Sequence, residues 1–549
     1  MTRDDGIDDE ASPSAHAPDA SMVARQWLEV ELALTGPDVA DPYGDVEAWV
    51  VFRHTGGRQL RRPVFWDGAT SYKVRFASPE PDGGWRWEVH AADREHTFTP
   101  ASGDVAAAPP LASHPHRALT RGLVSTHPAR RSFCHADGSP AFFVFDTAWA
   151  MPWRANVDDV AVYAADRQAK GFNAVFMMSV QPDMDARGPV GRNLDEGFEV
   201  GFHDLSEGRL ARLNVTYFQY LDRIVDVLLD HGITPVWQPV FHGYGWKGLR
   251  AAGPVVPPQE YARYCRYLVA RYGARPAVYL PGADGAGSEP QIEAGGREIH
   301  AWDAYDQPTG IHYRPHHRND EHQADEWLDF QSCQTGHVGD HVPDRVATMW
   351  AQRPVKAIMN GEPSYEHTGR RGVAEGWWQG HEAWCNLCAG ALMGVAYGAA
   401  GLWQWRLHPD EAGHGEYFIA PGAGWREALG FEGSRYVGLV GRIVADLPIA
   451  DARPCWDVST NTRGLLDPGV LFLGYAEHGG PWVFLDAEGR MPSSYWLIDP
   501  REGRVLKAGM RPPDHVPIAF DHHVPCVLIC AETTPAFITS VRASSPGWR

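Results

Sequence analysis

The chain has 549 residues, of which 44% are hydrophobic and 11% aromatic, and its formal net charge at pH 7 is -20. A chain of this length can bury more than one hydrophobic core, so about two to four domains are expected. The acidic balance excludes a nucleic-acid partner, because binding to phosphates requires a basic surface. The 22 tryptophans supply many flat aromatic faces, which either fill cores or bind the C–H faces of sugars.

Residues 1–24 are predicted to form a disordered acidic tail, because they are rich in Asp, Ala, Ser and Pro. They lack a cationic start followed by an apolar run, so they do not resemble a secretory signal. No later stretch approaches the roughly 20 apolar residues that a membrane span needs. We therefore expect a cytoplasmic protein that has no membrane partner, and self-association remains open.

Residues 25–110 alternate apolar and polar positions in short runs separated by turns, which predicts an N-terminal β-sandwich of immunoglobulin-like type. The predicted strands are Trp27–Leu32, Glu47–Phe52, Tyr72–Phe76 and Trp85–Val89. The small residues and two prolines of 106–110 then predict a linker.

Residues 111–448 change to short apolar runs separated by helical patterns, which is typical of repeated β-α units on a parallel sheet. Eight runs are present: Phe142–Phe145, Ala174–Met178, Thr234–Gln238, Ala277–Leu280, Gly310–Tyr313, Trp327–Phe330, Val355–Met359 and Gly401–Trp405. Eight strands are the number that a closed (β/α)8 barrel requires. Between them, one helix is predicted after the cap Asn214 and another over Tyr261–Tyr272. The pair Cys385 and Cys388 is interpreted as part of a helix core, because no further zinc ligands accompany it.

Residues 449–549 return to strands and turns, which predicts a C-terminal β-sandwich. Its predicted strands are Val470–Tyr475, Trp482–Leu485, Tyr495–Ile498 and Cys526–Cys530. The fold class is therefore α/β, a (β/α)8 TIM barrel flanked by an N-terminal and a C-terminal β-sandwich.

The side chains at the carboxyl ends of barrel strands carry the chemistry in such folds. Hydrolysis of a glycoside needs one carboxylic acid to protonate the leaving oxygen and one carboxylate at the anomeric carbon. Asp284 after the fourth run and Glu362 after the seventh suit this chemistry, with Glu289 and Glu366 as alternatives. Candidate sugar-binding residues at the other strand ends are Asp146, Trp149, Gln181, His242, His312, Gln334, His337, Asn360, Trp403 and Trp405. Each histidine, and either of the last two tryptophans, would equally fit a structural role.

Four short segments resemble the apiosidase-like glycoside hydrolases of family 140. They are Phe145-Asp-Thr-Ala-Trp149, Gly282-Ala-Asp284, Gln334-Thr-Gly-His337 and Asn360-Gly-Glu-Pro363. The resemblance extends to both flanking β domains. It implies a glycosidase with a retaining mechanism, in which Asp284 is the acid/base and Glu362 is the nucleophile. It departs from the family at the alanine before Asp284 and at the segment 285–308, which is predicted to be a long loop lining the substrate cleft.

The leading hypothesis is thus an exo-acting retaining glycosidase that acts on a small glycoside or oligosaccharide. The sugar could be a pentofuranoside, such as an apioside or arabinofuranoside, or a hexoside. No cofactor or metal is expected. Two alternatives remain: a metal-dependent barrel hydrolase, suggested by His312, His316 and His317, and a non-catalytic carbohydrate-binding protein.

Overall fold

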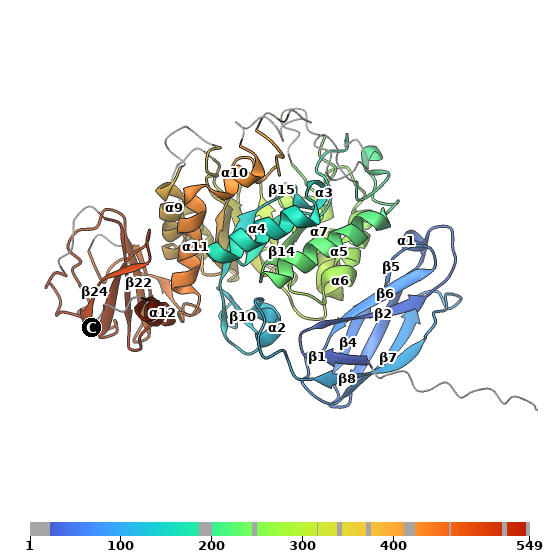
Figure 1. Ribbon diagram of the computed structural model, residues 1–549, viewed down its shortest axis with the longest axis horizontal. Coiled ribbons are helices and arrows are strands. Elements are labelled where there is room, and N and C mark those ends of the chain that lie inside the picture. The colour runs from blue at the N-terminus through green and yellow to red at the C-terminus, as the bar shows by residue number, and fades with distance from the viewer. Residues whose placement is uncertain are drawn as a thin grey trace, which may run out of the picture.

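The protein is described by a computed structural model, in which residues 22–185, 200–243, 250–315, 317–337, 343–368, 375–409, 411, 423–460, 463–518 and 524–544 are placed. A parallel eight-stranded barrel lies at the centre, with antiparallel β domains before and after it in the chain (Figure 1). The predicted fold class is therefore confirmed. The first residues of the acidic tail lie outside the described part of the chain, whereas Met22–Arg25 is a strand, so the ordered structure begins before residue 25.

The barrel strands follow one another around the sheet in chain order. They are β12 (Phe143–Thr147), β13 (Ala174–Met178), β14 (Thr234–Gln238), β15 (Val278–Gly285), β16 (Thr309–Tyr313), β17 (Phe330–Gln334), β18 (Ala357–Glu362) and β19 (Gly394–Tyr397). From β12 to β18 each strand pairs in parallel with the next, and β19 pairs with β12, so β18 and β19 are the two ends of the sheet. Just beyond β18 and β19, the backbone of Glu366 bonds to those of Gly398 and Ala400, which joins the last two strands at the top of the barrel.

Helices cover the outside of the barrel, and their ends follow local sequence signals. They are α3 (Met151–Arg154), α4 (Val157–Lys170), α5 (Val215–Asp230), α6 (Pro258–Tyr272), α7 (Pro290–Trp302), α8 (Pro343–Ala351), α9 (Trp377–Cys388), α10 (Trp425–Leu429) and α11 (Glu432–Val444). The side chain of Asn214 caps α5 by accepting the N–H of Tyr217, as predicted. Cys385 and Cys388 lie buried on α9, which confirms the interpretation as helix core.

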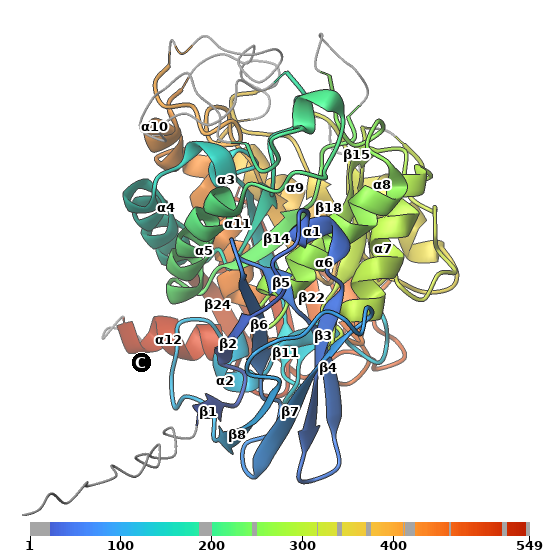
Figure 2. The ribbon, with the colours of Figure 1, turned by 90° about the vertical axis from the view of Figure 1, so that its right-hand side faces the viewer.

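The N-terminal β domain is a sandwich of two sheets packed beneath α5 and α6 (Figures 1 and 2). Its strands are β1 (Met22–Arg25), β2 (Glu29–Thr35), β3 (Ala48–His54), β4 (Gln59–Pro63), β5 (Phe65–Trp66), β6 (Ser71–Ala77), β7 (Gly84–Ala91) and β8 (Ser102–Ala108). Arg75 of β6 and Arg271 of α6 both pair with Asp222 of α5, at 2.6 and 2.8 Å. Burial raises the pKa of Asp222, but the two guanidinium groups outweigh it and lower that pKa to about 2. This shared carboxylate fixes the sandwich to the barrel.

The C-terminal β domain contains one six-stranded antiparallel sheet in its described residues. The strands are β20 (Arg453–Pro454), β21 (Arg463–Asp467), β22 (Leu471–Ala476), β23 (Ser494–Asp499), β24 (Arg504–Met510) and β25 (Cys526–Ala531). One face packs against the barrel, where Tyr475 bonds to His381 of α9 at 2.9 Å. Instead of the predicted strand Trp482–Leu485, isolated bridges at Trp482 and Phe484 cover the other face.

Three details of the barrel differ from the prediction. The predicted eighth strand, Gly401–Trp405, is a series of turns, and the true β19 lies before it, in a stretch whose Gly, Val and Ala residues give only a weak apolar signal. The sixth strand begins at Phe330, where the predicted run ended. The predicted loop 285–308 contains the whole of α7, whose first residue is the helix-starting Pro290.

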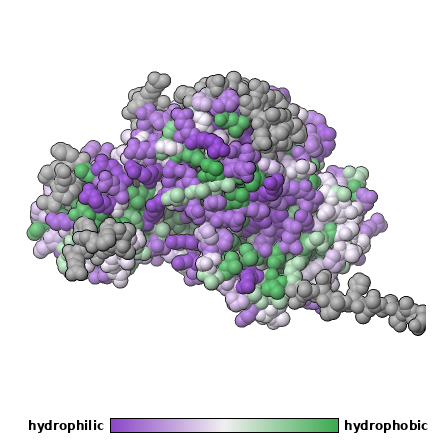
Figure 3. All heavy atoms as spheres, viewed as in Figure 1, coloured by the Kyte–Doolittle hydropathy of each residue, from purple (hydrophilic) through white to green (hydrophobic). Residues whose placement is uncertain are grey.

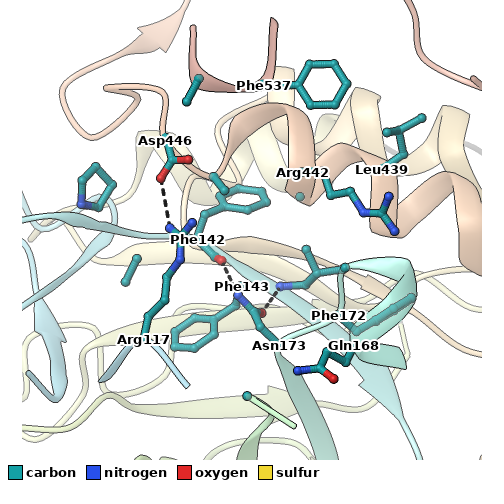
Figure 4. Close-up of a pocket in the computed structure, with 18 of the residues that line it drawn as sticks. Arg117, Phe142, Phe143, Gln168, Phe172, Asn173, Leu439, Arg442, Asp446 and Phe537 are labelled. Carbon is teal, nitrogen blue, oxygen red and sulfur yellow. Dashed lines mark hydrogen bonds and ion pairs between the residues drawn. The ribbon is translucent and has the colours of Figure 1, made fainter. Parts of the chain in front are cut away.

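A large hollow lies at the amino end of the barrel strands, and neither candidate acid lines it. It has a volume of 1120 Å³ and lies between the barrel, α11 and the C-terminal helix α12 (Ala536–Ser544). Phe142, Phe143 and Phe172 line it on one side and Leu439, Arg442 and Phe537 on the other (Figure 4). Arg117 forms an ion pair with Asp446, which lies just after α11, at 3.0 Å, and both residues line this hollow.

The described helices include none that is long and apolar enough to cross a membrane. The face shown in Figure 3 is mostly hydrophilic, with smaller hydrophobic areas. Helix α5 places its apolar residues inward and exposes polar ones, whereas α4 also exposes Val162.

Candidate active site

The two predicted acids come together at the carboxyl end of the barrel. Asp284 lies in a β-bulge, and Glu362 directly follows one. On β15, Asp284 is the extra residue between Ala283, which pairs with His312, and Gly285, which pairs with Tyr313. Its φ of 55° is unusual for a residue with a side chain. On β18, Gly361 is the extra residue between Asn360 and Glu362, opposite consecutive residues of β17. Bulges redirect side chains at barrel rims, and here they turn both carboxyl groups inward.

One histidine lies between the two carboxyl groups. Nε2 of His312 is 2.9 Å from Oε2 of Glu362 and 3.4 Å from Oδ1 of Asp284. A second histidine, His337, places its Nε2 at 3.0 Å from the other oxygen of Glu362. Glu362 therefore has an imidazole on each of its oxygens, whereas Asp284 has only the longer contact with His312.

This difference in partners moves the pKa values of the two acids in opposite directions. Burial raises the pKa of Asp284, the negative charge of Glu362 raises it further, and His312 only partly offsets both. Burial also acts to raise the pKa of Glu362, but the hydrogen bonds from His312 and His337 outweigh it and lower that pKa. The two carboxylates raise the pKa of His312 to about 9 despite its burial. These shifts favour a carboxylate at Glu362 and an imidazolium at His312, and they make Asp284 the weaker of the two acids.

Aromatic rings line the site beside His312 and His337. The Trp149 ring lies 5.5 Å from that of His312 and 5.0 Å from that of Phe176, and its Nε1 donates to the Tyr365 hydroxyl at 2.9 Å. Tyr365 in turn packs its ring 4.2 Å from His337. Burial and the charge of Glu362 raise the pKa of Tyr365, which keeps its hydroxyl protonated. Sequence reasoning missed Tyr365, although its position two residues after the Glu-Pro pair was a usable signal.

The surroundings of Gly361 leave no room for a side chain. A Cβ atom at this position would lie 2.2 Å from Oγ of Ser332 and 3.4 Å from Nδ1 of His312. Ser332 and His312 are register partners on β17 and β16. The glycine of the Asn-Gly-Glu-Pro segment therefore allows the neighbouring strand to hold His312 against the carboxyl groups.

The other predicted residues have different surroundings. Asp146 is fully buried in β12, where it accepts hydrogen bonds from Tyr163 at 2.9 Å and Arg167 at 2.5 Å, so its proposed contact with substrate is wrong. Trp405 is also wrong, because it is fully buried and stacks on Trp425 at 4.7 Å. Trp403 lies on a turn, not on a strand, and packs partly buried against the core.

Further candidates lie near the carboxyl ends of the strands but pack into their own loops. Gln181 accepts the N–H of Gly201 at 3.4 Å, and His242 is buried beside Tyr261. Gln334 is buried and pairs in register with Glu362. Of the alternative acids, Glu289 binds the N–H groups of Ala286 and Gly287 ahead of α7. Glu366 accepts hydrogen bonds from Gly376, Tyr397 and Gly433, so both alternative acids are structural.

The predicted histidine cluster lies partly outside the described residues, because His316 is not among them. Of the other two, His312 lies between the acids, and His317 stacks on Tyr313 with ring centres 6.1 Å apart. The described residues that could hold a metal ion are instead Asp284, His312 and Glu362, which offer one ligand atom each, all within 4.8 Å of one another.

Comparison with known proteins agrees with this architecture. Residues 127–451 match the family described as the apiosidase-like catalytic domain, which is more than half of the chain. The chain belongs to the apiosidase-like family. It is therefore a glycoside hydrolase, which favours an enzyme over the non-catalytic alternative. Residues 23–92, in the N-terminal sandwich, match a domain of unknown function, DUF5060.

Solved structures share the fold at low sequence identity. A glycoside hydrolase family 5 protein from Bacteroides vulgatus is 20% identical, with a TM-score of 0.64 over 78% of this chain and 96% of its own. Another protein from Bacteroides vulgatus, proposed to be a glycoside hydrolase, is 17% identical, with a TM-score of 0.67 over 93% of this chain and 100% of its own. A third structure, described as a glycoside hydrolase, is 18% identical, with a TM-score of 0.61 over 76% of this chain and 98% of its own. The search of curated proteins finds no match.

The space around Gly361 predicts the effect of adding one methyl group. We expect Gly361→Ala to lower kcat by about 10²-fold, because the new Cβ must displace Ser332 and with it His312. The double variant Gly361→Ala/Ser332→Ala should recover part of this loss, since the closest atom is removed. The measurement is kcat on the best substrate from a panel of nitrophenyl pentosides and hexosides.

The matched control is Gly84→Ala in the N-terminal sandwich, where the nearest atom to a new Cβ is a carbonyl oxygen at 3.8 Å. This control should keep wild-type kcat. Unchanged kcat in Gly361→Ala would contradict the role given to the close packing around His312.

Proposed function

We propose that this glycosidase is retaining and exo-acting, with Glu362 as its nucleophile and Asp284 as its acid/base. The observation that carries the proposal is the closeness of the two acids, since one carboxyl oxygen of Asp284 lies within 4.8 Å of one carboxyl oxygen of Glu362. Retaining glycosidases hold their carboxyl groups about 5 to 5.5 Å apart, whereas inverting enzymes need about 6.5 to 9.5 Å to admit a water molecule. The separation favours direct attack by a carboxylate.

The charges of the resting site match the first step of this mechanism. Glu362 is the carboxylate that attacks the anomeric carbon, and the protonated Asp284 delivers its proton to the departing glycosidic oxygen. The product is a glycosyl ester on Glu362 and an ionised Asp284. Asp284 then removes a proton from the water that hydrolyses the ester, which regenerates both groups.

The imidazolium of His312 stabilises the negative charge of Glu362 beside Asp284 in a buried site. Without a cation, two carboxyl groups at this distance would share a proton and would lose their separate roles. Because His312 is closer to Glu362 than to Asp284, it favours ionisation of the nucleophile.

The substrate that we propose is a small glycoside or oligosaccharide with a terminal pentofuranosyl group, such as an apioside or an arabinofuranoside. Membership of the apiosidase-like family supports this choice. The Trp149 ring beside His312 offers an apolar face to the C–H groups of a sugar, and His337 is half-buried within reach of a hydroxyl. A hexoside remains the alternative, and the nitrophenyl glycoside panel distinguishes the two.

A second candidate is a metal-dependent hydrolase, which the grouping of Asp284, His312 and Glu362 favours. In that case His312 would bind the ion as a neutral imidazole, and the carboxylates would not need its proton. The glycosidase proposal expects full activity after dialysis against EDTA, with no stoichiometric metal by elemental analysis. Loss of activity that is restored by one divalent cation would favour the metal site.

The role of Asp284 predicts a dependence on the leaving group. Asp284→Asn should lower kcat/KM by about 10² to 10⁴-fold on glycosides with poor leaving groups, which need a proton, and much less on a dinitrophenyl glycoside. The raised pKa of Asp284 places the alkaline limb of the wild-type pH profile above the usual range of Asp, because activity is lost as this acid ionises. That limb should disappear in Asp284→Asn. An equal loss on both substrates would contradict the acid/base role.

The role of Glu362 predicts a covalent intermediate. A 2-fluoro glycoside of the preferred sugar, with a good leaving group, should accumulate on the enzyme and inactivate it in proportion to the sites labelled. Peptide mapping by mass spectrometry should find the added mass on the peptide that contains Glu362. The matched control is Glu366→Gln, which should still be labelled at Glu362 if it folds. A label on another carboxylate would refute the assignment.

A further inference from the structure

A third carboxyl group, that of Glu382, lies buried behind the strand end that carries Glu362. It projects from α9 and is 2% exposed. Its Oε2 accepts the N–H of Ser364 at 3.1 Å, and its Oε1 lies 3.5 Å from the hydroxyl oxygen of Thr335. Ser364 and Thr335 follow β18 and β17, so Glu382 contacts the two segments on either side of the nucleophile.

The amide of Asn360 fixes the direction of the hydrogen bonds in this region. One end of the amide lies 3.2 Å from each of the backbone carbonyl oxygens of Cys333 and Glu362. Carbonyl oxygens can only accept, so this end must be the NH2 group. The amide oxygen then faces the Thr335 hydroxyl at 2.9 Å, and that hydroxyl must donate to it.

The direction of these hydrogen bonds indicates that Glu382 carries a proton. The Thr335 hydroxyl has a single hydrogen, and Asn360 uses it, so the oxygen of Thr335 presents only lone pairs to Glu382. An ionised Glu382 would place two acceptors 3.5 Å apart in a buried site, whereas a protonated Glu382 can donate.

We propose that Glu382 is a positioning residue that acts as an uncharged carboxylic acid. It begins a chain of hydrogen bonds that runs through Thr335 and Asn360 to the backbone carbonyl of Glu362. The same carbonyl also accepts the N–H of Thr335 at 3.1 Å, so the chain holds the bulged end of β18 from both sides. The proposal rests on the proposed function, in which Glu362 is the nucleophile.

The surroundings of Glu382 agree with an uncharged group. Burial raises its pKa to about 7, although hydrogen bonds from the N–H and the side chain of Ser364 and from the side chain of Trp378, together with the nearby His337, act in the opposite direction. The thiols of Cys333 and Cys385 also face it, and burial raises their pKa values to about 12, so they stay neutral.

The raised pKa gives stability a definite pH dependence. In the unfolded chain Glu382 ionises at about 4.5, and in the folded protein at about 7. Between these values the folded state binds more protons than the unfolded state, so stability falls as the pH rises, and the loss is complete above about 7. Glu382→Gln should lack this loss, and its melting temperature relative to the wild type should rise from pH 5 to pH 8. Asp303, whose pKa burial also raises to about 7, contributes equally to both proteins.

Kinetics of three full-length variants test the positioning role. Glu382→Gln keeps a donor toward Thr335 and an acceptor for Ser364, so kcat should stay within about three-fold of wild type. Glu382→Leu removes both and should lower kcat by about ten-fold or more with KM nearly unchanged, because the nucleophile is displaced while the sugar site remains. Thr335→Val breaks the chain at its next member without changing the shape, and should lower kcat in the same way.

Each result decides the proposal. Wild-type kcat in Glu382→Leu, or equal losses in the Gln and Leu variants, would overturn it. If the Leu variant does not fold, wild-type kcat in Thr335→Val overturns it instead. If the 2-fluoro glycoside labels another residue, the nucleophile assignment fails, whereas the melting experiment still reports whether Glu382 is uncharged.

Discussion

The site depends on one constraint, which is that two carboxyl groups lie close together where little water can screen them. Charges of like sign at this separation repel strongly in a medium of low dielectric constant. His312 resolves the conflict by placing one protonated nitrogen 2.9 Å from Glu362 and 3.4 Å from Asp284. The unequal distances make Glu362 the stronger acid and Asp284 the weaker one, and His337 increases this difference because it contacts the carboxyl group of Glu362 at 3.0 Å. The chemistry of the pair is therefore set by the position of the imidazoles.

The backbone places the acids beside the imidazoles through two β-bulges in the parallel barrel. Asp284 occupies a left-handed conformation at the bulge of β15, and Gly361 forms the bulge of β18 because a side chain would meet Ser332. In a regular strand alternate residues face opposite sides of the sheet, and each bulge interrupts this alternation at or just before one of the acids. Strands β17 and β18 pair in regular register up to Asn360, directly before the second bulge. The irregular backbone is thus held by regular packing, which is the usual condition for keeping strained residues at a functional site.

Much of this could be predicted from the sequence, and the failures have physical reasons. The strands β13 and β14 and the first residue of the helix after Asn214 were predicted correctly, since long apolar stripes and bounded apolar runs are strong signals. The eighth strand was wrong because the tryptophans of Gly401–Trp405 resemble a buried strand, whereas β19 has only four residues, Gly394–Tyr397, and two of them are Gly and Ala. The two acids were found from their place after apolar runs. The bulges, and the partners that separate the acids electrostatically, depend on contacts between strands far apart in the chain and could not be read from it.

Three glutamates of this region illustrate how surroundings decide the role of one residue type. Glu362 faces two imidazoles and is held as a carboxylate. Glu366, only four residues later, faces the hydroxyl of Tyr397 and the backbone N–H groups of Gly376 and Gly433, and it joins β18 to the helices that follow. Glu382 faces a hydroxyl whose hydrogen is already used, and this favours its neutral form. Because a carboxyl group can accept or donate according to its proton, the neighbouring donors and acceptors choose its charge. A list of acids at strand ends is therefore only the first step toward a mechanism, and the hydrogen-bond direction around each acid is the second.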